Sequence, residues 1–87
     1  MVIYKTDDFL RHAKKLPHDA NRFLREQETI FVENWLDSRL HIKKLKETEG
    51  VYSFRITRRY RALFYFQNSK SVVFFSIGHR KEIYKRK

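Results

Sequence analysis

The segment VYSFRITRRYRALFYFQNSKSVVFFSI, which spans residues 51–77, decides the fold of this chain. In Val51–Thr57 apolar and polar residues alternate, which is typical of a strand with one buried face. Tyr60–Phe66 is rich in aromatic residues, and Val72–Ile77 has the composition of a strand that is buried on both faces. The dipeptide Asn68-Ser69 lies between these two stretches and favours a hairpin turn. The segment therefore predicts three consecutive strands.

Upstream of these strands the pattern becomes helical. Val2–Lys5 is a short apolar stretch, and Thr6-Asp7-Asp8 after it is suited to cap a helix over Phe9–Leu16 that Pro17 ends. A longer helix is expected from His18 or Asp19, because apolar residues then recur at spacings of three and four: Ala20, Phe23, Leu24, Ile30, Phe31, Trp35 and Leu36. The expected order is β-α-α-β-β-β. We therefore predict an α+β fold, with a helical hairpin packed on a small, twisted, mainly antiparallel sheet, in a single domain over residues 1–87.

Composition excludes several classes of protein. The chain has 87 residues, is 41% hydrophobic and 16% aromatic, and so does not resemble a disordered segment. No apolar run approaches the roughly 20 residues of a membrane span, and no secretory signal is recognised at the start, so a cytoplasmic protein with no membrane partner is expected. The absence of cysteine excludes disulfides and thiolate metal sites. No motif for a metal, a nucleotide cofactor or acyl transfer is found, so no cofactor is expected.

The positive charge is concentrated in the second half of the chain. Residues 1–40 carry seven basic and seven acidic side chains, whereas residues 41–87 carry thirteen basic and three acidic ones, which accounts for the net charge of +10. Such segregation is typical of a surface that meets a polyanion. Nucleic acid is the first candidate partner, an acidic protein the second and an anionic membrane a distant third. A basic domain that is merely well solvated remains the plainer alternative.

The arginines near the first hairpin predict a phosphate-binding face. A three-residue turn at Arg58-Arg59 would place Arg55 directly opposite Arg61, and such like-charged pairs are destabilising unless an anion neutralises them. If the alternation continues through the next hairpin, His79 reaches the same face as Arg61. The expected face then also includes the residues after the last strand, namely Arg80, Lys81 and Tyr84. Guanidinium groups bind phosphate oxygens in pairs, and an aromatic ring offers a base a stacking surface.

Each of these residues also has a purely structural interpretation. Arg55 fits a solvated strand face, His79 fits an ordinary surface histidine, and the tyrosines fit the packing of a core. The lysines ahead of the strands have two interpretations, as a solvated charge run or as contacts to RNA: Lys43, Lys44 and Lys46.

Four segments taken together resemble the RelE/ParE superfamily of toxins from bacterial and archaeal toxin–antitoxin systems. They are Lys43-Lys44-Leu45, Gly50–Ile56, Tyr60–Phe64 and Ile77–Tyr84, and with the two helices the resemblance covers nearly the whole chain. It implies two helices on a twisted antiparallel sheet, and inhibition of growth until a cognate acidic antitoxin binds.

Within this superfamily the chain is most similar to the RelE branch, the ribosome-dependent mRNA interferases. These cut mRNA in the ribosomal A site without a metal, through attack of the ribose 2′-hydroxyl on the adjacent phosphate. The resemblance implies that Arg55 activates the 2′-hydroxyl or holds the phosphate, and that Arg61 stabilises the transition state. It implies that Arg80 lies near the leaving 5′ oxygen and that Tyr84 stacks on or orients the base. Contacts to RNA or the ribosome are expected from Lys43, Lys44, Lys46, Arg58, Arg59 and Lys81.

One position departs from the family pattern. Ser53 stands where the best-known member has a second lysine, and a serine does not replace that charge. We therefore consider His79 for proton transfer, because the ordinary pKa of histidine lies near the working pH. Two alternatives to the nuclease stay open: a ParE-like inhibitor of DNA gyrase without chemistry of its own, and a degenerate member that only binds antitoxin. The combination of Arg61, Arg80 and Tyr84 favours cleavage.

Overall fold

The computed structural model describes residues 1–86, and the side chains of residues 1–85. It confirms the expected α+β order and adds three short elements that the sequence patterns did not indicate: a 3₁₀ helix, strand β2 and helix α3. The elements are β1 (Val2–Lys5), α1 (Asp7–Lys14), α2 (His18–Glu33), the 3₁₀ helix (Ser38–Leu40), β2 (Lys43–Lys44), β3 (Val51–Arg55), β4 (Tyr60–Asn68), β5 (Ser71–His79) and α3 (Ile83–Arg86).

The helical hairpin is confirmed, but α1 (Asp7–Lys14) lies two residues closer to the N-terminus than the expected Phe9–Leu16. The Thr6 hydroxyl accepts a hydrogen bond of 3.1 Å from the Phe9 amide and so caps α1. Pro17 lies between the two helices and stands at the N-cap of α2, where its missing amide hydrogen costs no helical bond. The second helix ends at Glu33, so Trp35 and Leu36 lie beyond it rather than on its apolar face.

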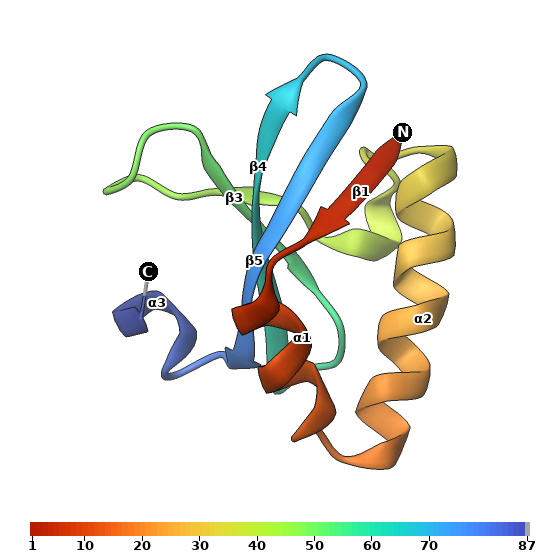
Figure 1. The fold of residues 1–87 in the computed structure, drawn as a ribbon, viewed down its shortest axis with the longest axis vertical. Helices are drawn as coiled ribbons and strands as arrows, with labels where there is room; N and C mark the ends of the chain where they lie inside the picture. The colour runs from red at the N-terminus through yellow and green to blue at the C-terminus, as the bar shows by residue number, and fades with distance from the viewer. Residues whose placement is uncertain (87) are drawn as a thin grey trace.

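The sheet has five strands in the order β1-β5-β4-β3-β2. Only the β1–β5 pair among the described residues is parallel, and the remaining pairs are antiparallel, as expected for this composition. Figure 1 shows β5 and β4 at the centre, with β1 along one side and the β2–β3 ribbon crossing behind. The long central hairpin therefore supports both edges of the sheet.

Helices α1 and α2 cover one face of the sheet, and aromatic side chains fill the space between. Phe31 of α2 is fully buried, with ring centroids 5.0 Å from Phe64 and 5.2 Å from Phe74 in edge-on contacts. Two residues expected on the apolar face of this helical region are instead exposed, Phe23 by 38% and Leu36 by 66%. Phe23 borders a surface pocket that Tyr60 of β4 also lines, and Leu36 follows the end of α2.

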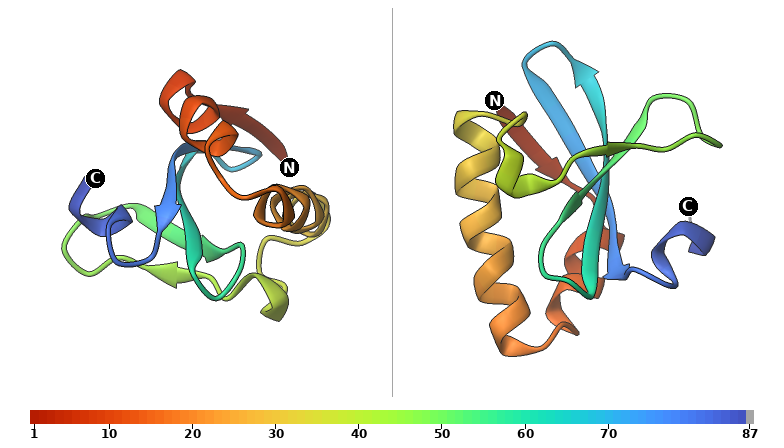
Figure 2. Two further views of the ribbon diagram at one scale, coloured as in Figure 1. Left: turned by 90° about the horizontal axis from the view of Figure 1, so that it is seen from below. Right: turned by 180° about the vertical axis from the view of Figure 1, so that it is seen from behind.

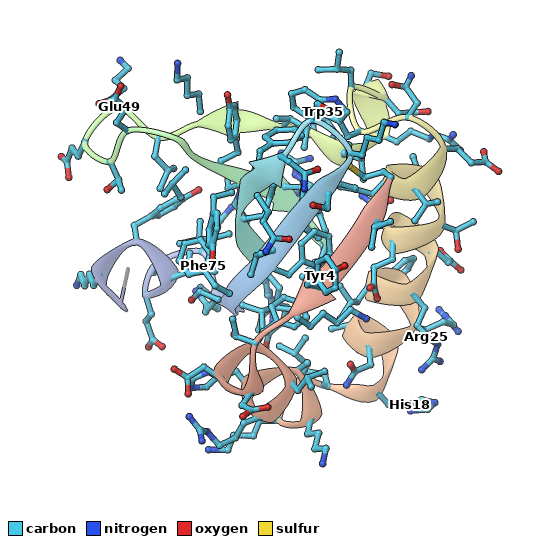
Figure 3. The ribbon with its side chains drawn as sticks, turned by 45° about the horizontal axis from the view of Figure 1, so that its top comes forward. Tyr4, His18, Arg25, Trp35, Glu49 and Phe75 are labelled. Carbon is cyan, nitrogen blue, oxygen red and sulfur yellow. The ribbon has the colours of Figure 1, made fainter. Side chains whose placement is uncertain are left out.

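Helix α3 lies on the other side of the sheet from α2 (Figure 2). The loop between β2 and β3 extends on that same side, and Glu49 stands at its tip (Figure 3). Gly50, which has a φ of 79°, ends this loop and returns the chain into β3. The face of the sheet that the two long helices leave uncovered is therefore bordered by the β2–β3 ribbon and by α3.

Candidate functional site

A pocket of about 330 Å³ is formed on this uncovered face, and we call it the cationic groove. Its described lining consists of six cationic side chains and one tyrosine, without a carboxylate: Lys43, Arg55, Arg58, Arg61, Arg80, Lys81 and Tyr84. They come from β2, β3, the β3–β4 turn, β4 and the segment after β5. So much positive charge without a neutralising carboxylate predicts that the groove binds an anion.

The first hairpin has the register that the sequence predicts. Arg55 of β3 pairs directly with Arg61 of β4, so both side chains lie on the same face of the sheet. Directly opposed like charges are unfavourable across a strand pair, and an anion between them removes this cost. The pairing that the groove is built on therefore favours occupation by an anion.

Arg61 is held in place by hydrogen bonds to groups on two neighbouring segments. Its side chain donates to the Ser53 hydroxyl from Nε at 3.2 Å and from Nη2 at 3.0 Å, and Nη2 also donates to the His41 carbonyl at 2.7 Å. The residue is only 6% exposed. Burial lowers the pKa of Arg61; its interaction with Tyr84 opposes this shift and the neighbouring Arg55 adds to it. A guanidinium with this degree of fixation is preorganised to meet negative charge.

Ser53 and His41 are the two site residues that sequence reasoning did not assign to the support of Arg61. Ser53 is fully buried and accepts both of its bonds from the guanidinium, so it positions Arg61 rather than supplying charge. His41 has a left-handed backbone, with a φ of 48°, at the end of the 3₁₀ helix, and its carbonyl accepts from Arg61. The alternation of β3 indicates the face of Ser53, but no local signal indicates the His41 contact.

The segment after β5 is fastened to the β3–β4 turn. The Arg80 amide donates to the Arg59 carbonyl at 2.7 Å, and Arg80 Nη1 donates to the Arg58 carbonyl at 3.2 Å. Helix α3 follows, and its first residue, Ile83, is fully buried. This apolar anchor places the adjacent Tyr84, which is half-buried, in the lining of the groove.

The prediction that His79 shares a face with Arg61 is wrong. His79 pairs with Tyr60, and Arg61 pairs with Gly78, so the imidazole lies on the opposite face of the sheet. Its ring centroid is 5.8 Å from that of Tyr60, and its Nδ1 accepts a hydrogen bond from the Lys81 amide at 3.2 Å. The reason is the register of the β4–β5 hairpin. Asn68 pairs with Ser71 at the turn, and the two register shifts further along the strands cancel, so Tyr60 rather than Arg61 becomes the partner of His79.

The remaining basic residues predicted to contact RNA divide between the groove and other surfaces. Lys43 and Arg58 line the groove, whereas Lys44 pairs with Tyr52, whose side chain packs against the core on the other face. Lys46 is exposed in the loop after β2 and is not among the described lining residues. Arg59 borders a second pocket of about 430 Å³ that is formed with the start of α2 by Pro17, Asp19, Ala20, Phe23, Thr57, Arg58 and Tyr60.

The described residues 1–86 contain no group of three or more histidines and carboxylates that could hold a metal ion. None of the helices in this part of the chain has the length and hydropathy of a transmembrane segment.

The fold is similar to that of several solved toxin structures. A chain of the RelE–RelB complex from Pyrococcus horikoshii OT3 is 17% identical with a TM-score of 0.74, covering 91% of this chain and 93% of that chain. A chain of the RelB–RelE antitoxin–toxin complex from Methanococcus jannaschii is 23% identical with a TM-score of 0.76, covering 93% and 94%. The YoeB dimer from Staphylococcus aureus is 18% identical with a TM-score of 0.75, covering 92% and 97%.

No family model and no curated protein matches the sequence. At these identities the likeness to solved structures concerns the fold, which is of the RelE/ParE type that the sequence resemblance implies.

Proposed function

We propose that this chain, which has the RelE/ParE fold, is the toxin of a toxin–antitoxin pair and cleaves mRNA on the ribosome. The observation that carries the proposal is the convergence of Arg55, Arg61, Arg80 and Tyr84 on one groove with no carboxylate among its described lining residues. A phosphodiester supplies the anion that this groove lacks, and an RNA base supplies a partner for the tyrosine ring. The solved structures of the same fold include toxins captured with their antitoxins.

The proposed reaction needs no metal. The ribose 2′ oxygen attacks the adjacent phosphorus, the bond from phosphorus to the 5′ oxygen breaks, and a 2′,3′-cyclic phosphate and a 5′-hydroxyl result. Negative charge accumulates on the phosphate oxygens in the transition state, where a fixed cation stabilises it most. Arg61 is the buried guanidinium of the groove and therefore takes this role, with Arg55 and Arg80 beside the same phosphate.

The expected result of toeprinting on a translated message is a new stop at the A-site codon when the purified protein is added. The cut should need the ribosome, because in this proposal the ribosome presents the single-stranded codon to the groove. Treating the purified protein with a chelator of divalent metals before it is added to the ribosomes should leave the cut unchanged. Intact message combined with blocked DNA supercoiling would support the ParE-like alternative. Intact message with unaffected supercoiling would support a degenerate toxin and would contradict the proposed nuclease.

The proposed antitoxin is an acidic chain that covers the cationic groove. Thirteen basic against three acidic residues after position 40 provide the charge complementarity, and a disordered acidic segment that orders on binding can cover such a surface. Co-expression with the product of the adjacent reading frame should give a complex that co-purifies and dissociates as salt rises. A basic product, or one that does not co-purify, would contradict this part of the proposal.

A further inference from the structure

We propose that Lys43 accepts the proton of the attacking 2′-hydroxyl, an inference that rests on the proposed nuclease function. Proton removal needs a side chain in the groove that exists in an uncharged form. The four guanidinium groups of the lining do not meet this condition, because arginine stays protonated in proteins. Lys43, Lys81 and Tyr84 are the other described lining residues, and His79 lies on the opposite face of the sheet.

Strand pairing brings Lys43 next to the residue that holds Arg61. Lys43 of β2 is the direct partner of Ser53 in β3, so the two side chains leave the sheet on the same face, with Cβ atoms about 4.5–5.5 Å apart. The Ser53 hydroxyl in turn accepts two hydrogen bonds from Arg61, the longer of them 3.2 Å. A phosphate bound by Arg61 would therefore lie on the same face of the sheet as Lys43.

The two other groups are less well placed for this role. Lys81 lies in the turn between β5 and α3 and takes no part in the strand pairing around Ser53. Tyr84 interacts with the Arg61 guanidinium itself, and in the proposed function its ring stacks on the RNA base. Lys43 is thus the amine on the strand next to the proposed phosphate site.

The charged groups around Lys43 are mainly cations. The groove contributes its other basic residues, and Lys44 lies next in β2 on the opposite face. The 45–50 loop carries Lys46, Glu47 and Glu49, and His41 stands just before the strand. None of the described residues that line the groove beside Lys43 carries a carboxylate.

The step balances without a further reactant. Neutral Lys43 takes the proton from the 2′-hydroxyl while the 2′ oxygen forms its bond to phosphorus. The bond from phosphorus to the 5′ oxygen breaks with both electrons going to that oxygen, which takes up a proton from solvent. Lys43 then releases its proton to solvent. Because a general base acts in its uncharged form, the rate should rise with pH.

The test uses the absence of cysteine from the chain. Lys43→Cys introduces a single thiol, which aminoethylation converts into a lysine analogue with an amine at nearly the same position. Lys70→Cys is the matched control, with the same change at an exposed lysine in the turn between β4 and β5, outside the groove and outside the expected RNA contacts. Single-turnover cleavage on programmed ribosomes is measured across pH, beside affinity for the same ribosomes carrying a message with a 2′-deoxy nucleotide at the cleavage position.

Lys43→Cys is expected to lower the cleavage rate about 10²–10⁴-fold, the usual contribution of a general base, with a much smaller change in affinity. Aminoethylation should restore most of the rate and its rise with pH, whereas carboxamidomethylation should not. Lys43→Arg, which keeps the charge, should stay defective. Parental cleavage by Lys43→Arg, or no recovery on aminoethylation of a folded protein, would overturn the role of Lys43. Absence of cleavage by the parent would instead overturn the proposed function together with this inference.

Discussion

Arg61→Ala is expected to lower the single-turnover cleavage rate at saturating ribosome about 10²–10³-fold, or about 2.7–4 kcal/mol of transition-state stabilisation. The reason is the fixation of the guanidinium by Ser53 and the His41 carbonyl, which prepares it for charge that develops only in the transition state. Affinity for the programmed ribosome should change much less, because the other cations of the groove still attract the phosphates.

Arg61 also has a structural interpretation that the same experiment tests. The guanidinium joins β4 to β3 and to the end of the 3₁₀ helix, so its loss could lower stability instead of chemistry. Thermal melts recorded beside the kinetics distinguish the two effects. Arg25→Ala is the control, since Arg25 is exposed on α2 (Figure 3), across the sheet from the groove. A folded Arg61→Ala protein that cleaves at the parental rate would end the catalytic assignment.

Ser53→Lys, which introduces the lysine that the sequence resemblance implies at this position, is expected to destabilise this protein by about 3–5 kcal/mol. Ser53 is fully buried and its hydroxyl is 3.0 Å from Arg61 Nη2. A lysine there would lose the acceptor of two hydrogen bonds and place a second buried cation against the first. For a domain of this size the change corresponds to a fall in Tm of roughly 12 °C or more.

The control for this substitution is Ser69→Lys, which adds the same charge in the exposed turn between β4 and β5. Its Tm should stay close to that of the parent. Ser53→Ala should give an intermediate loss, because it removes the hydrogen-bond acceptor without adding a charge. A Ser53→Lys protein with the Tm of the parent and a higher cleavage rate would contradict the role of Ser53 in positioning Arg61.

The sequence by itself determined those features that depend on residues close together along the chain. The Thr6 cap and Pro17 set the limits of the helical hairpin, and the alternation of Val51–Thr57 set the faces of β3. The turn at Arg58-Arg59 set the register that opposes Arg55 and Arg61. These features follow from backbone geometry over a few residues, and the charge segregation follows from counting.

Only the tertiary structure decided which of the candidate residues meet. Ile77 pairs with Ala62 in the core, and this register turns His79 away from Arg61, because each step along a strand reverses the face. A two-residue strand, too short to be seen in the sequence pattern, separates Lys43 from Lys44 by placing them on opposite faces. The support of Arg61 combines the buried Ser53 hydroxyl, 8 residues away along the chain, with the His41 carbonyl, 20 residues away at the end of the 3₁₀ helix. Which residues make such contacts depends on how the whole core packs, so the pattern of neighbouring residues in the sequence does not predict them.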